Sequence, residues 1–264
     1  MEIFVIFNTI IMSLLSPFGL ILNNSLINVI SNTSENVENV KIRVNSIPTH
    51  QLLKGEVDSL QISLKQWQPQ PNIRIELLEL ETDSVKLNLP EIRHIKLDNW
   101  QKSLKSPLNM GYRLILTEND LNNLIKSPQA ESIIAKVGGN SQESQFQIIS
   151  LTFNLLPNNR IAIDTKLKFP TRTEELLNVN LEFSLQLIKG HTLKINDIQG
   201  TLNNRRLSSK LLQGFADNIN TQLNLRNLEK SGITMRLLQL NINENNLEIT
   251  GFLHLQPQLS HSNL

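Results

Sequence analysis

Beyond Glu35, most of the chain alternates apolar and polar residues one by one, and this pattern constrains the fold more than any other feature. A period of two places all the apolar side chains of a β-strand on one face. The longest run sets Val179, Leu181, Phe183, Leu185 and Leu187 against Asn180, Glu182, Ser184 and Gln186. Shorter runs of the same kind start at Val40, Leu60, Val85, Ile161 and Leu247. The pattern predicts about nine or ten strands, each with one apolar face.

In three places two apolar neighbours interrupt the alternation, at Leu77–Leu78, Ile148–Ile149 and Leu237–Leu238. One extra residue in a strand turns every later side chain to the opposite face. We therefore expect a β-bulge or a sharp bend at each position, within long, half-buried antiparallel strands.

Helices are few in the pattern. Thr117, followed by Glu118 and Asp120, is typical of a helix N-cap with an acidic first turn, and helical segments are expected near 117–137. The best helix is predicted near 206–223. Its apolar side consists of Leu207, Leu211, Leu212, Phe215, Ala216, Ile219 and Leu223.

The strands present more apolar surface than two or three helices can cover as a flat layer, so the sheet is expected to curl. It either closes on itself as a barrel or sandwich, or it wraps around the long helix and encloses an apolar channel. A well-packed sandwich with a solid core fits the pattern equally well. In all of these cases the fold class is α+β with antiparallel strands.

The N-terminal segment is apolar from Ile3 to Leu22, and no charged residue occurs between Glu2 and Glu35. As a helix it has a thin polar edge, and Phe4, Phe7, Ile11, Leu14 and Phe18 lie opposite that edge. We favour a helix that lies on a membrane or docks into the protein's own groove. A span is less favoured because the segment is barely long enough and contains polar residues, Pro17 and Gly19. A cleaved signal is less favoured because no basic residue precedes the apolar run. The predicted organisation is an apolar N-terminal helix over 1–30 and one β-rich domain over 36–264.

Composition and motifs exclude several kinds of chemistry. The 25 Lys and Arg against 24 Asp and Glu give no field that would gather nucleic acid, and with no Cys the chain has no disulfide or thiolate site. No phosphate-binding loop or serine-hydrolase motif occurs, and the five histidines lack metal-site spacing. We expect no metal and no cofactor, and no nucleic-acid partner.

Three charged groups remain as candidates. Glu79, Glu81 and Asp83 alternate along one strand and are candidates for a cation site, although the solvated face of a strand is the simpler interpretation. Trp100 lies among basic residues, as side chains at a membrane interface do, although an ordinary exposed loop is the simpler interpretation. Arg205, Arg206 and Lys210, at the start of the long predicted helix, oppose its dipole, so they are candidates for lipid headgroup contact or a solvated basic turn.

Three segments together resemble the LmeA-like phospholipid-binding proteins, which are common in actinobacteria and cyanobacteria. They are the LLSPFG segment of residues 14–19, the LLKGEVDSLQI segment of residues 52–62 and the LTENDLNNLIKSP segment of residues 116–128. The resemblance implies a tubular (TULIP-like) lipid-binding fold, in which a long, strongly curved antiparallel sheet wraps around a long amphipathic helix and leaves a cavity for acyl chains. It implies no catalytic residues.

The pattern and the resemblance together predict a non-enzymatic phospholipid-binding protein at a membrane surface, with a role in lipid transfer or in envelope and membrane lipid homeostasis. The expected groove is lined by Val179, Leu181, Phe183, Leu185, Leu187, Leu211, Phe215 and Ile219. The expected membrane contacts are Phe4, Phe7, Ile11, Leu14, Phe18 and Trp100. The sequence does not identify the protein partners or the side of the membrane.

Two alternatives stay open. One is a membrane-anchored structural or assembly factor with a solid β core and no lipid cargo. The other is an enzyme acting on lipid-linked sugar, which needs converging carboxylates. Its candidates are Asp98, Asp120, Asp164 and Asp197, each of which is more typical of a turn or cap.

Overall fold

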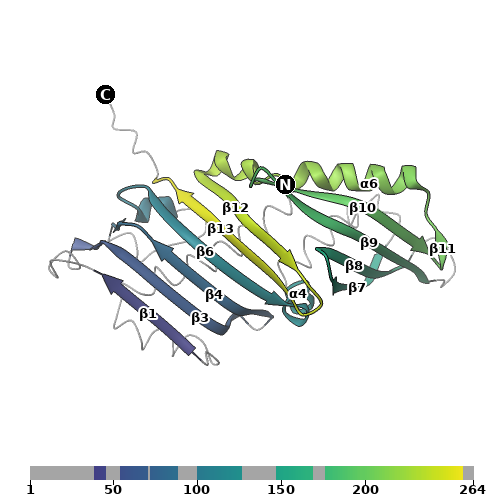
Figure 1. The fold of residues 1–264 in the computed structure, drawn as a ribbon, viewed down its shortest axis with the longest axis horizontal. Helices are drawn as coiled ribbons and strands as arrows, with labels where there is room; N and C mark the ends of the chain where they lie inside the picture. Colours follow the sequence, from purple (N-terminus) through teal and green to yellow (C-terminus); the bar gives the residue numbers. More distant parts are fainter. Residues whose placement is uncertain are drawn as a thin grey trace.

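The computed structural model describes residues 39–45, 54–70, 72–88, 100–126, 147–168 and 176–257. Within these ranges the chain forms two large antiparallel sheets and a two-stranded one, with two α-helices and short 3₁₀ segments (Figure 1). The α+β class with antiparallel strands is thereby confirmed. Neither large sheet closes on itself within the described residues.

The six-stranded sheet has the order β1-β3-β4-β6-β13-β12. Its strands are β1 (Asn39–Asn45), β3 (Ser59–Gln70), β4 (Ile73–Thr82), β6 (Leu108–Thr117), β13 (Asn246–Leu255) and β12 (Ile233–Ile242). Two short strands, β2 (Glu56–Val57) and β5 (Val85–Lys86), pair beside it. One face of this sheet carries the larger hydrophobic core, in which Leu64, Leu78 and Leu253 have no exposed surface.

The five-stranded sheet has the order β11-β10-β9-β8-β7. Its strands are β11 (Arg205–Arg206), β10 (Thr192–Leu202), β9 (Leu176–Ile188), β8 (Arg160–Lys168) and β7 (Gln147–Leu156). Its turns contain Asn158, Asn159, Asn203 and Asn204 with φ between 47° and 64°. Asn tolerates this left-handed conformation better than most residues, and this suits the asparagine-rich turns of the chain to tight hairpins.

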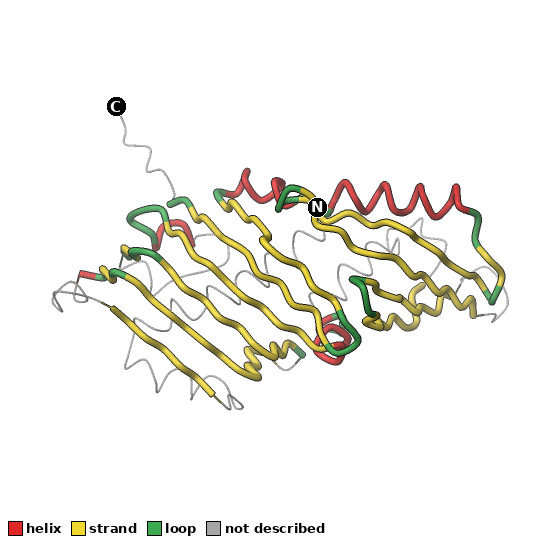
Figure 2. Tube along the Cα trace, in the orientation of Figure 1, coloured by secondary structure: helices red, strands yellow, loops and turns green. Residues whose placement is uncertain are grey.

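The helices lie at the margins of the sheets. Helix α4 (Glu118–Leu124) follows β6 directly and lies where the two sheets meet. Helix α6 (Ser209–Gln222) and the 3₁₀ segment η3 (Leu225–Ser231) run in line along one long side of the molecule (Figure 2). A second 3₁₀ segment, η2, spans Trp100–Ser103. None of the helices in the described ranges is long and apolar enough to cross a bilayer.

The two large sheets are joined through the turns of the five-stranded sheet. The N–H of Leu237 in β12 donates to the carbonyl of Gly190, which lies in the β9–β10 turn. At the end of β12, the N–H of Ile242 donates to Oδ1 of Asn159, and the N–H of Asn159 donates to the carbonyl of Ile242. Both contacts lie at the near end of the five-stranded sheet, so its opposite end, which we call the distal end, points away from the six-stranded sheet (Figure 1).

Two of the three predicted strand irregularities are confirmed. The pairing register shifts between Ile148 and Ser150 in β7 and between Leu237 and Gln239 in β12. At Leu77–Leu78 the register of β4 does not shift, and both residues are buried. The alternation breaks there because β4 buries both of its faces around this point.

The predicted helix at 206–223 starts later than expected. Arg205 and Arg206 form strand β11, after the Asn203–Asn204 turn, and Ser208 is the N-cap of α6. The assignment of Arg206 to the helix, and of both arginines to its start, was therefore wrong. Thr117 is confirmed as the N-cap of α4. A single long sheet wrapped around the helix is not confirmed, because α6 packs mainly against β10 of the smaller sheet.

Candidate lipid-binding site

The predicted groove residues of β9 lie on one face of the five-stranded sheet, in rows that cross the strands. Val179 is level with Thr165 on β8 and Leu202 on β10, and Thr165 is level with Leu151 on β7. The next row contains Phe153, Ile163, Leu181 and Gly200. We call these two rows the distal apolar face. The following row, nearer the six-stranded sheet, contains Leu155, Ile161 and Phe183.

Burial changes sharply from row to row. Phe183, Ile161 and Leu155 are only 6%, 8% and 3% exposed and belong to the second hydrophobic core, which reaches Ile242 at the end of β12. The residues of the distal apolar face are all half-buried, and among them Phe153 and Ile163 still pack against the second core. The near part of this sheet is therefore a solid core, and its distal part is an apolar surface that is incompletely covered.

Leu185 and Leu187 complete the predicted set on β9. Leu185 packs against the second core, and Leu187 packs against the core of the six-stranded sheet. The structure thus brings all five predicted β9 residues to one face. Phe183, Leu185 and Leu187 contact packed cores, whereas Val179 and Leu181 lie where the face is open.

Helix α6 covers the β10 side of this face. Its buried residues are Leu212 and Ala216, and Ile219 packs against the second core. The close approach depends on Gly200, where a Cβ atom would lie 2.7 Å from Cδ2 of Leu181 and 3.1 Å from Cδ2 of Leu212. A side chain at this position would therefore force Leu181 and its neighbours to move.

The remaining predicted helix residues lie on another side of α6. The N–H of Ile195 in β10 donates to Oδ1 of Asn220 at 2.7 Å, which fixes the flank of the helix that faces β10. At about 100° per residue, Leu211 and Phe215 are about 140–180° away from Asn220, on the flank turned away from β10. They are 59% and 38% exposed. Their predicted packing together with Leu212 is not observed.

Helix α4 closes the free edge of β7. The side chain of Asn122 bonds to both the N–H and the carbonyl of Phe153, and the carboxylate of Glu118 accepts from the N–H of Leu155 at 2.8 Å. Asp120 forms a capping box with Thr117 and an ion pair with Arg74 of β4. The hydrogen bond to Asp120 is the main cause that raises the pKa of Arg74. This segment, the most specific part of the family resemblance, is a structural clamp between the two sheets.

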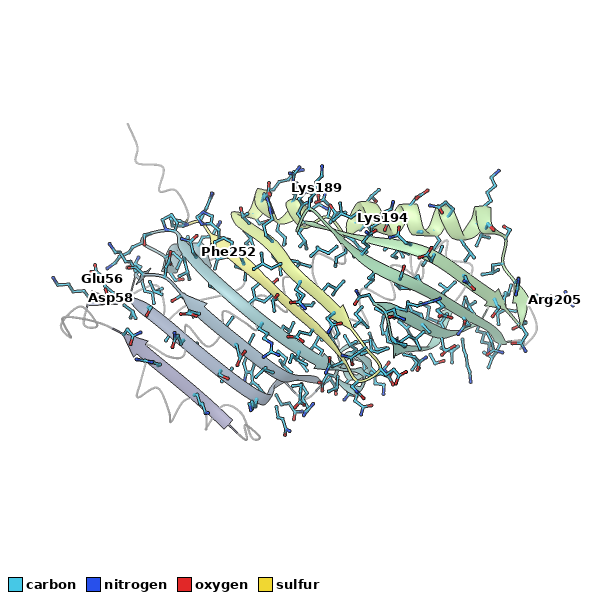
Figure 3. The ribbon with its side chains drawn as sticks, in the orientation of Figure 1. Glu56, Asp58, Lys189, Lys194, Arg205 and Phe252 are labelled. Carbon is cyan, nitrogen blue, oxygen red and sulfur yellow. The ribbon has the colours of Figure 1, made fainter. Side chains whose placement is uncertain are left out.

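The predicted headgroup residues lie at the distal end of the sheet. Arg205, Arg206 and Lys210 are all exposed, and Arg205 lies at the extreme end of the molecule (Figure 3). The six ion pairs found in the described part of the chain include none of these three cations.

The acidic candidates have structural partners. Glu81 accepts from Gln61, and Glu79 and Glu248 flank Arg113 on the outer face of the six-stranded sheet. Hydrogen bonding to Glu248 is the main cause that raises the pKa of Arg113. An open depression of about 460 Å³ lies there. Its lining combines the charged and polar residues Lys41, Arg43, Gln61, Ser63, Glu79, Glu81 and Arg113 with Ile62, Leu80, Gly111 and Tyr112.

The carboxylates considered for catalysis occupy separate elements. Asp120 caps α4, Asp164 of β8 accepts from Asn154 and Asn180, and Asp197 lies in a bulge of β10 and accepts from Ser184. Asp98 lies outside the described residues. So do the predicted membrane contacts Phe4, Phe7, Ile11, Leu14 and Phe18, and of Trp100 only the backbone is described.

Sequence reasoning missed the residues that hold the site together. Gly200, Asn122 and Asn220 carry no chemistry of their own. Asn122 belongs to the resemblance segment of residues 117–122, but nothing in its sequence marks edge capping. A Gly inside a run of strand residues is the one signal that pointed to a close approach.

These features define a class of protein: a β-rich α+β protein in which one apolar sheet face is half covered by an amphipathic helix and remains partly open. The family model of LmeA-like phospholipid-binding proteins matches residues 15–252, so the chain belongs to this family. No curated protein and no solved structure matches the chain.

Proposed function

We propose that this protein binds a phospholipid without catalysing a reaction, and that the acyl chains lie on the distal apolar face beside α6. The observation that carries the proposal is the decrease in side-chain burial along β9, from the buried Phe183 to the half-buried Leu181 and Val179. Membership of a phospholipid-binding family supports lipid as the occupant.

The driving force is the removal of apolar surface from water. Burial contributes about 25 cal/mol per Å², or about 0.8 kcal/mol for each CH₂ group. Leu211 and Phe215 extend the apolar surface along the flank of α6 that faces away from β10. Because Arg205, Arg206 and Lys210 lie at the same end, they are placed to contact the anionic headgroup.

In this proposal the five-stranded sheet and α6 form the described part of a tubular, TULIP-like lipid site. The apolar N-terminal helix, through Phe4, Phe7, Ile11, Leu14 and Phe18, and the Trp100 region bring the protein to a membrane. The role is lipid transfer or homeostasis at that membrane. Replacing Ile11 and Leu14 with Asp should move the protein from the membrane fraction to the soluble fraction of its host.

The experiment that tests the site is native mass spectrometry, with organic extraction, on protein purified gently from its host. We expect phospholipid at close to one molecule per chain. The Val179→Asp variant should reduce loading about tenfold or more, because an unpaired carboxylate is strongly disfavoured beside acyl chains. The matched control is Asn178→Asp, which adds the same charge one residue away on the exposed face of β9.

Circular dichroism and the melting temperature show whether both variants fold. Normal loading in a folded Val179→Asp variant would rule out the distal apolar face as the binding site. A compact, lipid-free wild-type protein would favour the assembly-factor alternative instead.

A further inference from the structure

The distal end of the five-stranded sheet gathers cations from segments that are far apart in the sequence. Lys168 of β8 pairs with Leu176 of β9, and Leu202 of β10 pairs with Arg205 of β11. The end of β8, the start of β9, the end of β10 and the start of α6 therefore share one edge. With about 4.8 Å between neighbouring strands, the five strands span about 20 Å at this end.

Five exposed cations lie on this edge: Lys166, Lys168, Arg205, Arg206 and Lys210. None of them takes part in an ion pair within the described residues. The nearest described carboxylate along β8, Asp164, accepts hydrogen bonds from Asn154 and Asn180. Among the described residues of a chain whose formal net charge is only +1, this is a local concentration of positive charge.

Apolar side chains are exposed at the same end. Of the six large hydrophobic residues that are exposed in the described ranges, Ile149, Leu176 and Leu211 lie here, with exposures of 47%, 44% and 59%. Ile149 lies at the bulge near the start of β7, and Leu211 follows Lys210 in the first turn of α6. Cations beside exposed aliphatic side chains are the combination that binds anionic lipid surfaces.

We propose that the protein docks end-on, with this distal end, onto an anionic phospholipid bilayer, and that acyl chains pass from there onto the distal apolar face. The proposal rests on the proposed function and adds the docking surface and the route of entry. On the face of Val179 and Leu181, the stretch of β9 from Leu177 to Phe183 is about 20 Å long, which exceeds the roughly 15 Å depth of one leaflet's hydrocarbon. An acyl chain leaving the leaflet at this end therefore meets apolar surface over its whole length before it reaches the packed core.

The test of docking is co-sedimentation of the full chain with phosphatidylcholine vesicles, with and without phosphatidylglycerol. The distal variant carries Lys166→Gln, Lys168→Gln, Arg205→Gln and Arg206→Gln. We expect its affinity for the anionic vesicles to fall about tenfold or more. The control variant removes four exposed cations of β1, β3 and β5, with Lys41→Gln, Arg43→Gln, Lys65→Gln and Lys86→Gln, and its affinity should change less than about twofold.

The orientation is tested separately, because the chain has no Cys and single Cys variants accept a label at one position only. An environment-sensitive dye at Leu176→Cys or Leu211→Cys should shift to the blue when anionic vesicles are added. The same dye at Leu238→Cys or Phe252→Cys, on exposed positions of the six-stranded sheet, should not shift.

The proposal would be overturned if the distal and control variants lost affinity for anionic vesicles equally, or if neither lost any. So would a dye at Leu176→Cys that is already blue-shifted before vesicles are added, because another protein surface would then cover this end. Lipid loading is measured by mass spectrometry on the same variants. Normal docking without bound lipid would refute the proposed function alone, and bound lipid without docking would refute only this inference.

Discussion

Asn122 of α4 takes the place of a neighbouring strand for Phe153 of β7. Its side-chain Nδ2 donates to the Phe153 carbonyl, and its Oδ1 accepts from the Phe153 N–H, both at 2.8 Å. The amide side chain thus reproduces the pair of hydrogen bonds that one strand residue exchanges with its partner in an antiparallel sheet. A seven-residue helix therefore attaches to the edge of a sheet by backbone-like geometry.

Asn122→Ala should destabilise the protein by about 1–3 kcal/mol, because it leaves a half-buried N–H and carbonyl without partners. Denaturant unfolding measures the loss, and hydrogen exchange of the Phe153 amide should become faster. Asn123→Ala, at the exposed neighbouring position, is the control and should change stability by less than about 0.5 kcal/mol. Equal effects of the two substitutions would show that the Asn122 contacts contribute nothing.

The two glycines near α6 should respond oppositely to the same substitution. Gly200→Ala introduces a Cβ 2.7 Å from Leu181 and 3.1 Å from the carbonyl oxygen of Asn180, so we expect a loss of about 1–3 kcal/mol. Gly214→Ala, inside α6, meets nothing within 4 Å and should stabilise the protein by about 0.5–1 kcal/mol. Melting temperatures of both variants check this, and a stabilising Gly200→Ala would show that α6 does not press on β10.

Arg74 forms an ion pair with the carboxylate of Asp120, which is almost completely buried. Asp120 is 1% exposed and lies 2.7 Å from Nη1 of Arg74, whereas Glu76, the second partner of Arg74, is 35% exposed. Arg74→Ala should cost about 2–3 kcal/mol, since the buried charge loses its counterion. Glu76→Ala should cost less than about 1 kcal/mol.

A second substitution tests the cause of the Arg74 effect. If the unpaired carboxylate is responsible, Asp120→Asn should recover part of the stability lost in Arg74→Ala, in a double-mutant cycle of denaturant unfolding. Strictly additive losses would mean that Arg74 acts independently of Asp120.

Tyr112 should make the protein sensitive to high pH. Its hydroxyl is buried without a hydrogen-bond partner among the described residues, and burial raises its pKa above the ordinary value of 10.0. The folded state therefore keeps the phenol protonated, while the unfolded chain ionises it near pH 10. The contribution of this pKa difference to the free energy of unfolding is fully present below pH 10, and it is lost as the pH rises further.

The ionisation of Tyr112 can be followed directly by absorbance, because it is the single tyrosine of the chain. Its tyrosinate absorbance should appear only together with alkaline unfolding. Tyr112→Phe should stabilise the protein by about 1 kcal/mol at neutral pH and weaken the alkaline decline. Ionisation near pH 10 in the folded state would show that the hydroxyl is accessible.

Alternation in the sequence was enough to predict which side chains share a face. The five predicted residues of β9 lie on one side, and two of the three irregularities are bulges. Alternation does not specify which strands pair, so it could not predict that the strands divide into two sheets. Nor could it separate the packed Phe183 from the open Val179, because that difference arises from contacts with β12 and α6.

The start of α6 was misassigned for a local reason. Arg205 and Arg206 have good helix propensity, and Leu207 fits the apolar stripe, but the preceding Asn203–Asn204 pair forms a hairpin turn and commits both arginines to β11. Leu211 and Phe215 lie outside the packed side of α6 for a related reason. A helical stripe wide enough to include Leu211 and Leu212 covers more than the surface that one sheet can bury.

The clamp formed by α4 also bears on how the protein avoids aggregation. Unpaired strand edges recruit further strands from other molecules. Here Asn122 and Glu118 occupy the edge of β7, Asn220 occupies part of the edge of β10, and the turn residues Asn159 and Gly190 occupy the edge of β12. Because a single short helix covers the β7 edge, local unfolding of α4 should expose that edge to other molecules while both sheets remain folded.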